Sequence, residues 1–186
     1  MTRLSVIRYP DPRLQEASER VEEFGPELAA FVDDLLDTLR PTGGIGLSAP
    51  QVGDRRAVFV MDLSEDHSEP QVFINPEILS RERDAWVTES CLSIPGVEGK
   101  VIRATRLRVR AQDEDGEVFE EDLEDMYAVC VQHEVDHLEG RLFIDRLRFF
   151  KRLLARRQAL RSARRVAADA VQVAGAVDSP TDSSRS

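Results

Sequence analysis

The chain has 186 residues, of which 41% are hydrophobic and 32% are charged. This length favours a single domain with a sizeable core, and the composition excludes a collagen-like or wholly disordered chain. The apolar runs are far shorter than the ~18 residues of a membrane-spanning helix, and the start of the chain lacks the apolar segment of a secretory signal. Because there are only two cysteines, Cys91 and Cys130, we expect a cytoplasmic protein without a disulfide framework.

Charge is divided between two parts of the chain. The formal net charge is -10, yet Arg146 to Arg165 contains nine basic residues and no acidic one. Residues 1–145, which we expect to form the folded domain, are therefore strongly acidic. This asymmetry points to contact with a nucleic acid or a membrane surface that is confined to one end of the chain.

The spacing of apolar residues predicts the elements in chain order. Residues 26–40 have helical spacing and end at the stop signal Pro41-Thr-Gly-Gly, so we expect an amphipathic helix there. Five runs with strand character follow, over 56–63, 71–79, 84–94, 106–113 and 117–123. Asp115-Gly116 predicts a hairpin turn between the last two. Helical spacing returns over 124–138, and the whole predicts an α+β fold with antiparallel strands around this central helix.

The C-terminal part of the chain divides into two segments. Over 146–165 we expect a basic helix whose apolar stripe docks on the preceding domain, with contacts from Leu147, Phe150 and Leu154. Residues 166–186 are rich in Ala, Ser, Asp and Val and contain no aromatic residue, which predicts a disordered tail.

The run His133-Glu134-Val135-Asp136-His137 carries the clearest chemistry. Residues four apart share one helix face, so both imidazoles can bind one metal ion while Glu134 reaches a water beside it. Three protein ligands and an open position make a catalytic site, because the metal lowers the pKa of bound water from ~16 towards ~7. The alternative is a surface helix with incidental histidines, which is the weaker interpretation in a chain with only three histidines.

The third ligand distinguishes between reaction classes. Metallopeptidases with this motif generally take it from downstream, but no histidine follows His137 and the only later glutamate is Glu139. The ligand must therefore come from upstream, where Cys91 and Cys130 offer the softest donors. Cys130 lies on the same helix, and its ~10.5 Å rise from His137 makes a shared coordination point awkward. We expect Cys130 to belong to the core.

Three runs of the sequence together resemble the signature motifs of peptide deformylases. They are Gly44-Ile45-Gly46-Leu47-Ser48-Ala49-Pro50-Gln51, Glu89-Ser90-Cys91-Leu92-Ser93 and Gln132-His133-Glu134-Val135-Asp136-His137-Leu138-Glu139-Gly140. All three occur in the order and spacing of the family, and the resemblance covers residues 5–150. Ser48 stands where the family usually has Ala, and Ser90 where it usually has Gly.

The resemblance implies a metal-dependent hydrolase of the bacterial type. Such an enzyme removes the N-formyl group from the formylmethionine of nascent polypeptides and releases formate. Carried onto this sequence, the metal ligands are Cys91, His133 and His137, and the general acid/base is Glu134. The usual ion of the family is Fe(II), for which Zn, Ni or Co can substitute.

The resemblance also implies the residues that surround the substrate. The oxyanion donors are Gln51 and the backbone N–H of Leu92. The residues that border the extended substrate peptide are Gly44, Ile45, Gly46 and Leu47. For Arg103, a substrate contact and a surface position on a strand are both open, and we expect the surface position.

Partners and alternatives follow from the same comparison. Some bacterial deformylases contact the ribosome near the tunnel exit through a C-terminal helix, and 146–165 resembles such a helix. The expected partners are therefore formylmethionyl nascent peptides and ribosomal RNA, with no membrane. Two alternatives stay open on the sequence, namely a metallopeptidase and a non-catalytic, metal-stabilised ribosome-binding protein. The second would not need Glu134 beside a metal ligand.

Overall fold

The computed structural model describes residues 3–177, and the side chains of residues 3–164. Within that range the α-helices are α1 (Pro26–Leu39), α2 (Asp125–Leu138) and α3 (Phe149–Val177). The strands are β1 (Gly46–Ser48), β2 (Val58–Met61), β3 (Gln71–Ser90), β4 (Glu98–Gln112) and β5 (Val118–Glu124). Short 3-10 turns complete the chain at η1 (Pro12–Gln15), η2 (Arg40–Thr42), η3 (Ala49–Val52) and η4 (Phe143–Arg146). The fold is α+β, as the sequence predicts.

The five strands form one antiparallel sheet in the order β1-β2-β3-β4-β5. Each strand pairs with the next along the chain, and the predicted turn at Asp115-Gly116 joins β4 to β5. The predicted runs 71–79 and 84–94 are wrong as separate strands, because β3 continues through the charged residues between them. Those residues are exposed and pair with β4, so they keep strand geometry without any apolar alternation to reveal it.

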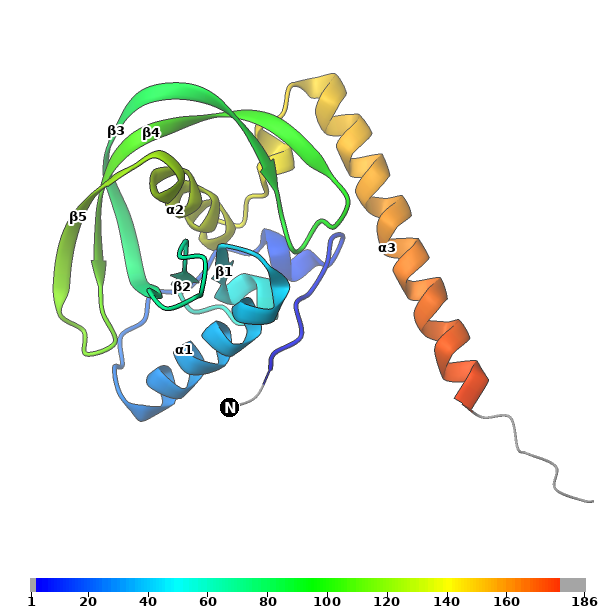
Figure 1. Ribbon diagram of the computed structural model, residues 1–186, viewed down its shortest axis with the longest axis horizontal. Helices are drawn as coiled ribbons and strands as arrows, with labels where there is room; N and C mark the ends of the chain where they lie inside the picture. The colour runs from blue at the N-terminus through cyan, green and yellow to red at the C-terminus, as the bar shows by residue number, and fades with distance from the viewer. Residues whose placement is uncertain (1–2, 178–186) are drawn as a thin grey trace, which may run out of the picture.

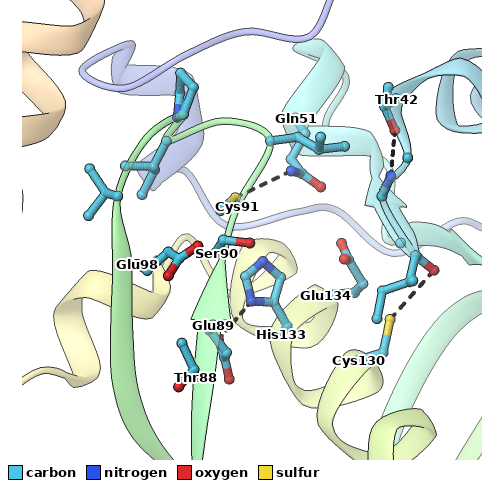
Figure 2. A pocket seen from close by; sticks show the side chains of 18 of the residues that line it. Thr42, Gln51, Thr88, Glu89, Ser90, Cys91, Glu98, Cys130, His133 and Glu134 are labelled. Atoms are coloured by element: carbon cyan, nitrogen blue, oxygen red, sulfur yellow. Dashed lines mark hydrogen bonds and ion pairs between the residues drawn. The ribbon is translucent and has the colours of Figure 1, made fainter.

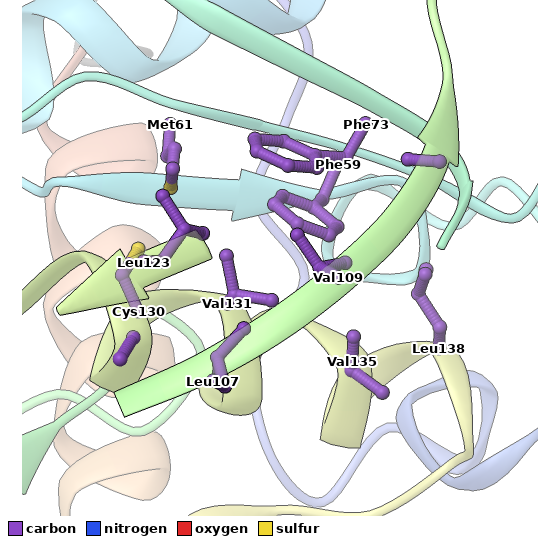
Figure 3. Packing of buried hydrophobic residues seen from close by; sticks show 12 residues of the cluster. Phe59, Met61, Phe73, Leu107, Val109, Leu123, Cys130, Val131, Val135 and Leu138 are labelled. Carbon is purple, nitrogen blue, oxygen red and sulfur yellow. The ribbon is translucent and has the colours of Figure 1, made fainter. Parts of the chain in front are cut away.

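Helix α2 lies inside the curved sheet, while α1 covers the opposite face of β2 (Figure 1). The four residues of β2 are all buried, because alternate side chains point to the two helices. Phe59 and Met61 pack in the cluster that includes α2, and Val58 and Val60 pack in the cluster that includes α1. Figure 3 shows the first cluster, in which Phe59 stacks on Phe73 at 4.7 Å between ring centroids.

Helix α3 packs on the domain through small side chains. Ala155 and Ala159 are buried in the cluster that contains Cys91, whereas Phe150 and Leu154 are 78% and 64% exposed. The predicted apolar stripe is therefore wrong: the helix begins at Phe149 rather than at residue 146, and the buried Leu147 precedes it. Alanines form the packed face because they let the helix approach more closely than the larger side chains would. The helix continues through 166–177, which the sequence predicts to be disordered, and 178–186 lie outside the described residues.

In the described part of the chain, no helix combines the length and the apolar character needed to cross a membrane.

Candidate active site

Three side chains that could hold a metal ion come together in the fold, namely Cys91, His133 and His137. Cys91 directly follows β3, and His133 and His137 lie one turn apart on α2. One potential ligand atom from each of the three lies within 4.8 Å of the others. Cys91 Sγ is 3.3 Å from His137 Nε2. The sheet and its central helix thus bring together residues that are far apart in the sequence.

This donor set fits one transition-metal ion. His133 Nδ1 is 2.8 Å from Glu89 Oε2, so the ring is held with Nε2 free to act as a ligand. A thiolate and two imidazoles are donors that transition metals prefer, and three protein ligands leave a position open for reaction. Cys130 is not part of this group, and it is buried in the core as predicted.

Arg103 lies behind the histidines and is only 2% exposed. Its Nε and Nη2 donate to the two oxygens of Glu89 at 2.5 and 3.0 Å, and its Nη1 donates to Asp136 at 2.6 Å. Arg146, at the end of η4, donates to the same Asp136 carboxylate. The predicted surface position of Arg103 is therefore wrong. The residue pattern of β4 does not show which of its side chains point into the protein. The two carboxylates that bind Arg103, those of Glu89 and Asp136, nevertheless lie within the motifs named above.

Glu89 is the ionised link between Arg103 and His133. Burial favours its neutral form, but the hydrogen bonds with His133 and Arg103 outweigh burial and lower the pKa of Glu89 to about 2. The carboxylate therefore accepts from both neighbours and fixes the orientation of the His133 ring. No local signal in the sequence indicates that Glu89 and Asp136 share Arg103 as a buried partner.

Glu134 is buried beside the metal-binding group. Burial raises the pKa of Glu134 to about 7, a value suited to taking and returning a proton near neutral pH. Its Oε2 is buried and has no hydrogen-bond partner among the described residues. Gly46 in β1 approaches so closely that a Cβ there would lie 2.5 Å from Glu134 Oε1, so a larger residue would have to displace this carboxylate.

Gln51 points its amide nitrogen towards Cys91 (Figure 2). Ser48 donates to Gln51 Oε1 from both its backbone nitrogen and its hydroxyl, at 2.9 and 3.0 Å. Gln51 Nε2 is consequently directed to Cys91 Sγ at 3.6 Å and Ser93 Oγ at 3.3 Å. The hydroxyl of Ser48, at a position where deformylases usually have alanine, adds a contact that orients this amide.

A cavity of about 950 Å³ opens in front of these groups. Its lining includes the predicted residues Gly44, Ile45, Gly46, Gln51, Cys91, Leu92, His133 and Glu134. His137 is not among the residues that line the cavity and is 1% exposed. The side chain of Leu47 packs against α1 in the core. This side chain therefore does not border the cavity, contrary to the prediction. Gln158 of α3 also lines the cavity, which the sequence analysis did not anticipate.

Comparison with known proteins identifies the family of the chain. The profile of the polypeptide deformylase family matches residues 3–153. The chain belongs to the peptide deformylase family. It is 48% identical to the peptide deformylase of Alkalilimnicola ehrlichii over 159 residues, which cover 85% of this chain and 89% of that protein. It is 45% identical to the enzyme of Chromobacterium violaceum over 147 residues, which cover 79% and 88% of the two chains.

Solved deformylase structures have the same fold. The Legionella pneumophila enzyme matches with a TM-score of 0.85 and 38% identity over 89% of this chain and 98% of that one. The Ehrlichia chaffeensis enzyme in complex with actinonin matches with a TM-score of 0.82 and 33% identity over 87% and 98%. The enzyme is therefore a peptide deformylase, which removes the N-formyl group from the formylmethionine of nascent polypeptides and releases formate. This family membership excludes the two alternatives, a metallopeptidase and a non-catalytic ribosome-binding protein.

Replacing Arg103 should strongly destabilise this deformylase. Arg103→Met leaves the carboxylates of Glu89 and Asp136 buried without their shared partner, which should lower the free energy of unfolding by about 3–5 kcal/mol. Urea unfolding followed by circular dichroism measures the loss. Arg106→Met on the same strand is the matched control, because its ion pair with Glu124 is exposed and contributes about 0–1 kcal/mol. Equal effects of the two substitutions would contradict the assigned role.

Proposed function

We propose that Cys91, His133 and His137 hold one Fe(II) ion and that Glu134 is the general acid/base of deformylation. The observation that carries the proposal is the meeting of three donor atoms beside a buried carboxylate that lacks a partner among the described residues. When bound, the ion acts as a Lewis acid on the formyl oxygen and lowers the pKa of water at its open position.

The protein residues then divide the remaining work. Glu134 takes the proton from the attacking water and returns it to the amine that leaves. Gln51 Nε2 and the backbone N–H of Leu92 donate to the formyl oxygen as negative charge develops on it. Such preorganised donors stabilise the transition state more than the substrate. The hydrogen bonds from Ser48 support this role, because they hold the Gln51 amide in one orientation.

We propose that the substrate peptide lies extended beside β1. This strand is at the edge of the sheet and pairs with β2 on one side. An extended peptide can add to such an edge through backbone hydrogen bonds. Gly44, Ile45 and Gly46 line the cavity at this edge, and Leu47 contributes through its backbone. The formylated end would then face Glu134.

Glu134→Gln should retain the metal and lose activity. Glutamine preserves the shape of the side chain but cannot take and return a proton, so kcat should fall by about 10²–10⁴-fold. Turnover of a formyl-Met peptide and elemental analysis of the same preparation measure the two properties. Glu139→Gln, just after the end of α2, is the matched control. Near-normal turnover of Glu134→Gln with metal bound would refute the role.

The proposed iron predicts sensitivity to oxygen. If Fe(II) is held by the Cys91 thiolate at an accessible position, peroxide should inactivate the iron-loaded enzyme by oxidising the metal or the thiolate. Nickel- or zinc-loaded enzyme should survive the same treatment, and Cys91→Ser should bind the ion less tightly because a hard oxygen replaces a soft sulfur. Activity and metal content before and after exposure give the result. Peroxide resistance of the iron form would contradict an iron site.

We also propose that, in the cytoplasm, the basic segment 146–165 binds ribosomal RNA near the tunnel exit, beside the catalytic domain 1–145. Arg157, Arg161 and Arg164 are exposed, and among the described residues they form no ion pair. Repulsion among these cations is relieved when they meet a polyanion. A ribosome-bound enzyme would have its cavity beside emerging formylated chains.

Removing charge from α3 should release the enzyme from ribosomes. Truncation is unsuitable because it would expose the buried contacts of Ala155 and Ala159, so Arg157, Arg161 and Arg164 are each replaced with Gln. Cosedimentation with ribosomes should fall sharply and should depend on salt between about 50 and 200 mM, while turnover of a short formyl-Met peptide stays unchanged.

The control replaces three exposed arginines elsewhere with Gln, namely Arg3, Arg81 and Arg83. This variant should sediment with ribosomes as the parent enzyme does. Ribosome affinity that is insensitive both to salt and to the α3 substitutions would overturn the proposed partner.

A further inference from the structure

A second pocket lies away from the active site, where the outer face of the β3–β4 hairpin meets η4 and the start of α3. Its volume is about 460 Å³. Trp86, Lys100 and Ile102 line it from the strands, and Arg148 and Lys151 line it from the helix side. Trp86 is the only tryptophan of the chain, and Lys100 and Lys151 are its only lysines.

Two large apolar side chains, Trp86 and Ile102, lie on the strand side of this pocket. Trp86 and Ile102 are directly opposite each other in the β3–β4 pairing. They are 62% and 49% exposed, which is unusual for two large apolar side chains in contact on a strand pair. An exposed indole of this kind offers a face on which a planar group can stack.

The rim of the pocket carries positive charge that the protein does not neutralise. Lys100, Arg148 and Lys151 are exposed, and within residues 3–164 they have no ion pair. The remaining charges of the lining are already paired. Arg146 is bonded to Asp136, and Asp145 accepts from Arg156 at 2.7 Å. A ligand of this pocket would therefore meet an aromatic face surrounded by free cations.

We propose that this pocket binds an unpaired nucleotide of an RNA strand. The base stacks on Trp86 beside Ile102, and the flanking phosphates contact Lys100, Lys151 and Arg148. Aromatic faces and cations together are the means by which proteins bind single strands, because every base has a stacking face and every nucleotide a phosphate. The proposal rests on the proposed RNA partner of α3 and adds a site, between the β3–β4 hairpin and the start of α3, on which a base stacks.

Fluorescence of the single tryptophan reports the contact directly. Adding an unstructured adenylate RNA of about eight nucleotides to the full-length, metal-loaded enzyme should quench the fluorescence to a plateau. The same oligomer without bases should not quench it. Anisotropy of a labelled oligomer then measures affinity for variants that lack the tryptophan.

Substitutions separate stacking from charge. Trp86→Leu should weaken RNA binding by about five- to 150-fold and leave binding of the abasic oligomer unchanged, while Trp86→Phe should retain most of the affinity. Lys100→Gln with Lys151→Gln should weaken both oligomers and reduce the salt slope by about 1.4. Arg81→Gln with Arg83→Gln is the matched control. Turnover of a short formyl-Met peptide should stay unchanged in every variant, which shows that each is folded.

Three results would overturn the proposal. If Trp86→Leu binds RNA as tightly as the parent, or if the abasic oligomer binds as tightly as RNA, the surface is only a cationic patch. If Trp86→Leu weakens ribosome binding while no RNA oligomer quenches the fluorescence, the pocket contacts a ribosomal protein instead.

Failure of this site and failure of the ribosome proposal are distinguishable. Loss of ribosome binding in the Arg157, Arg161 and Arg164 variant, with none in Trp86→Leu, overturns the pocket alone. Quenching by RNA in an enzyme that does not sediment with ribosomes overturns the ribosomal partner alone.

Discussion

The buried Arg103 guanidinium joins the parts of the molecule on which the active site depends. Its donors connect the end of β3, through Glu89, to the last turn of α2, through Asp136. Asp136 in turn accepts from Arg146, which precedes α3. A buried ion pair of this kind stabilises little by itself, because both charges leave water. Its role is to fix the position of Glu89, which holds the His133 ring. The Glu89 carboxylate cannot move away without leaving the buried Arg103 charge without this partner.

Helix α2 is the second constraint, because it serves the core and the active site at once. Residues of one face, such as Val131 and Val135, pack against the sheet, and the other face carries the histidines and Glu134. Gln132 bonds to both backbone groups of Ala104 at 3.1 and 2.7 Å, which ties the helix to β4 at the level of the site. The helix thus cannot rotate to suit a ligand without breaking buried hydrogen bonds.

The basic helix α3 also contributes to the cavity in front of the candidate metal ligands. Gln158 donates to the Gly96 carbonyl at 2.5 Å and lines the substrate cavity, and Ala155 and Ala159 share a cluster with Cys91. The free cations and large apolar side chains of α3 face outwards. One helix therefore has a closely packed face on the active-site loop and a charged face for a partner, so the segment that is proposed to bind RNA also supports a wall of the substrate cavity.

Local pattern was enough to place α1 and α2 and to single out the candidate metal ligands Cys91, His133 and His137. The spacing of His133 and His137, the absence of a downstream ligand and the three motifs pointed to the Cys91, His133 and His137 group that the fold brings together. Helical spacing alone places both imidazoles on one face. The three motifs also identified the peptide deformylase family. Helix α1, helix α2 and the turn at Asp115-Gly116 have strong local signals, so their positions were predictable.

Long-range contacts decided the rest. Arg103 resembled a surface residue because its two carboxylates lie 14 and 33 residues away in sequence, and no local pattern shows that a charge has partners across the fold. The docking face of α3 was misassigned for the same reason. Leu154 and Ala155 are neighbours on one amphipathic helix, and the close approach of the Cys91 cluster selects the smaller of the two for burial. Burial of a charge and the choice of a packing face depend on the opposing surface, and that surface exists only after the chain has folded.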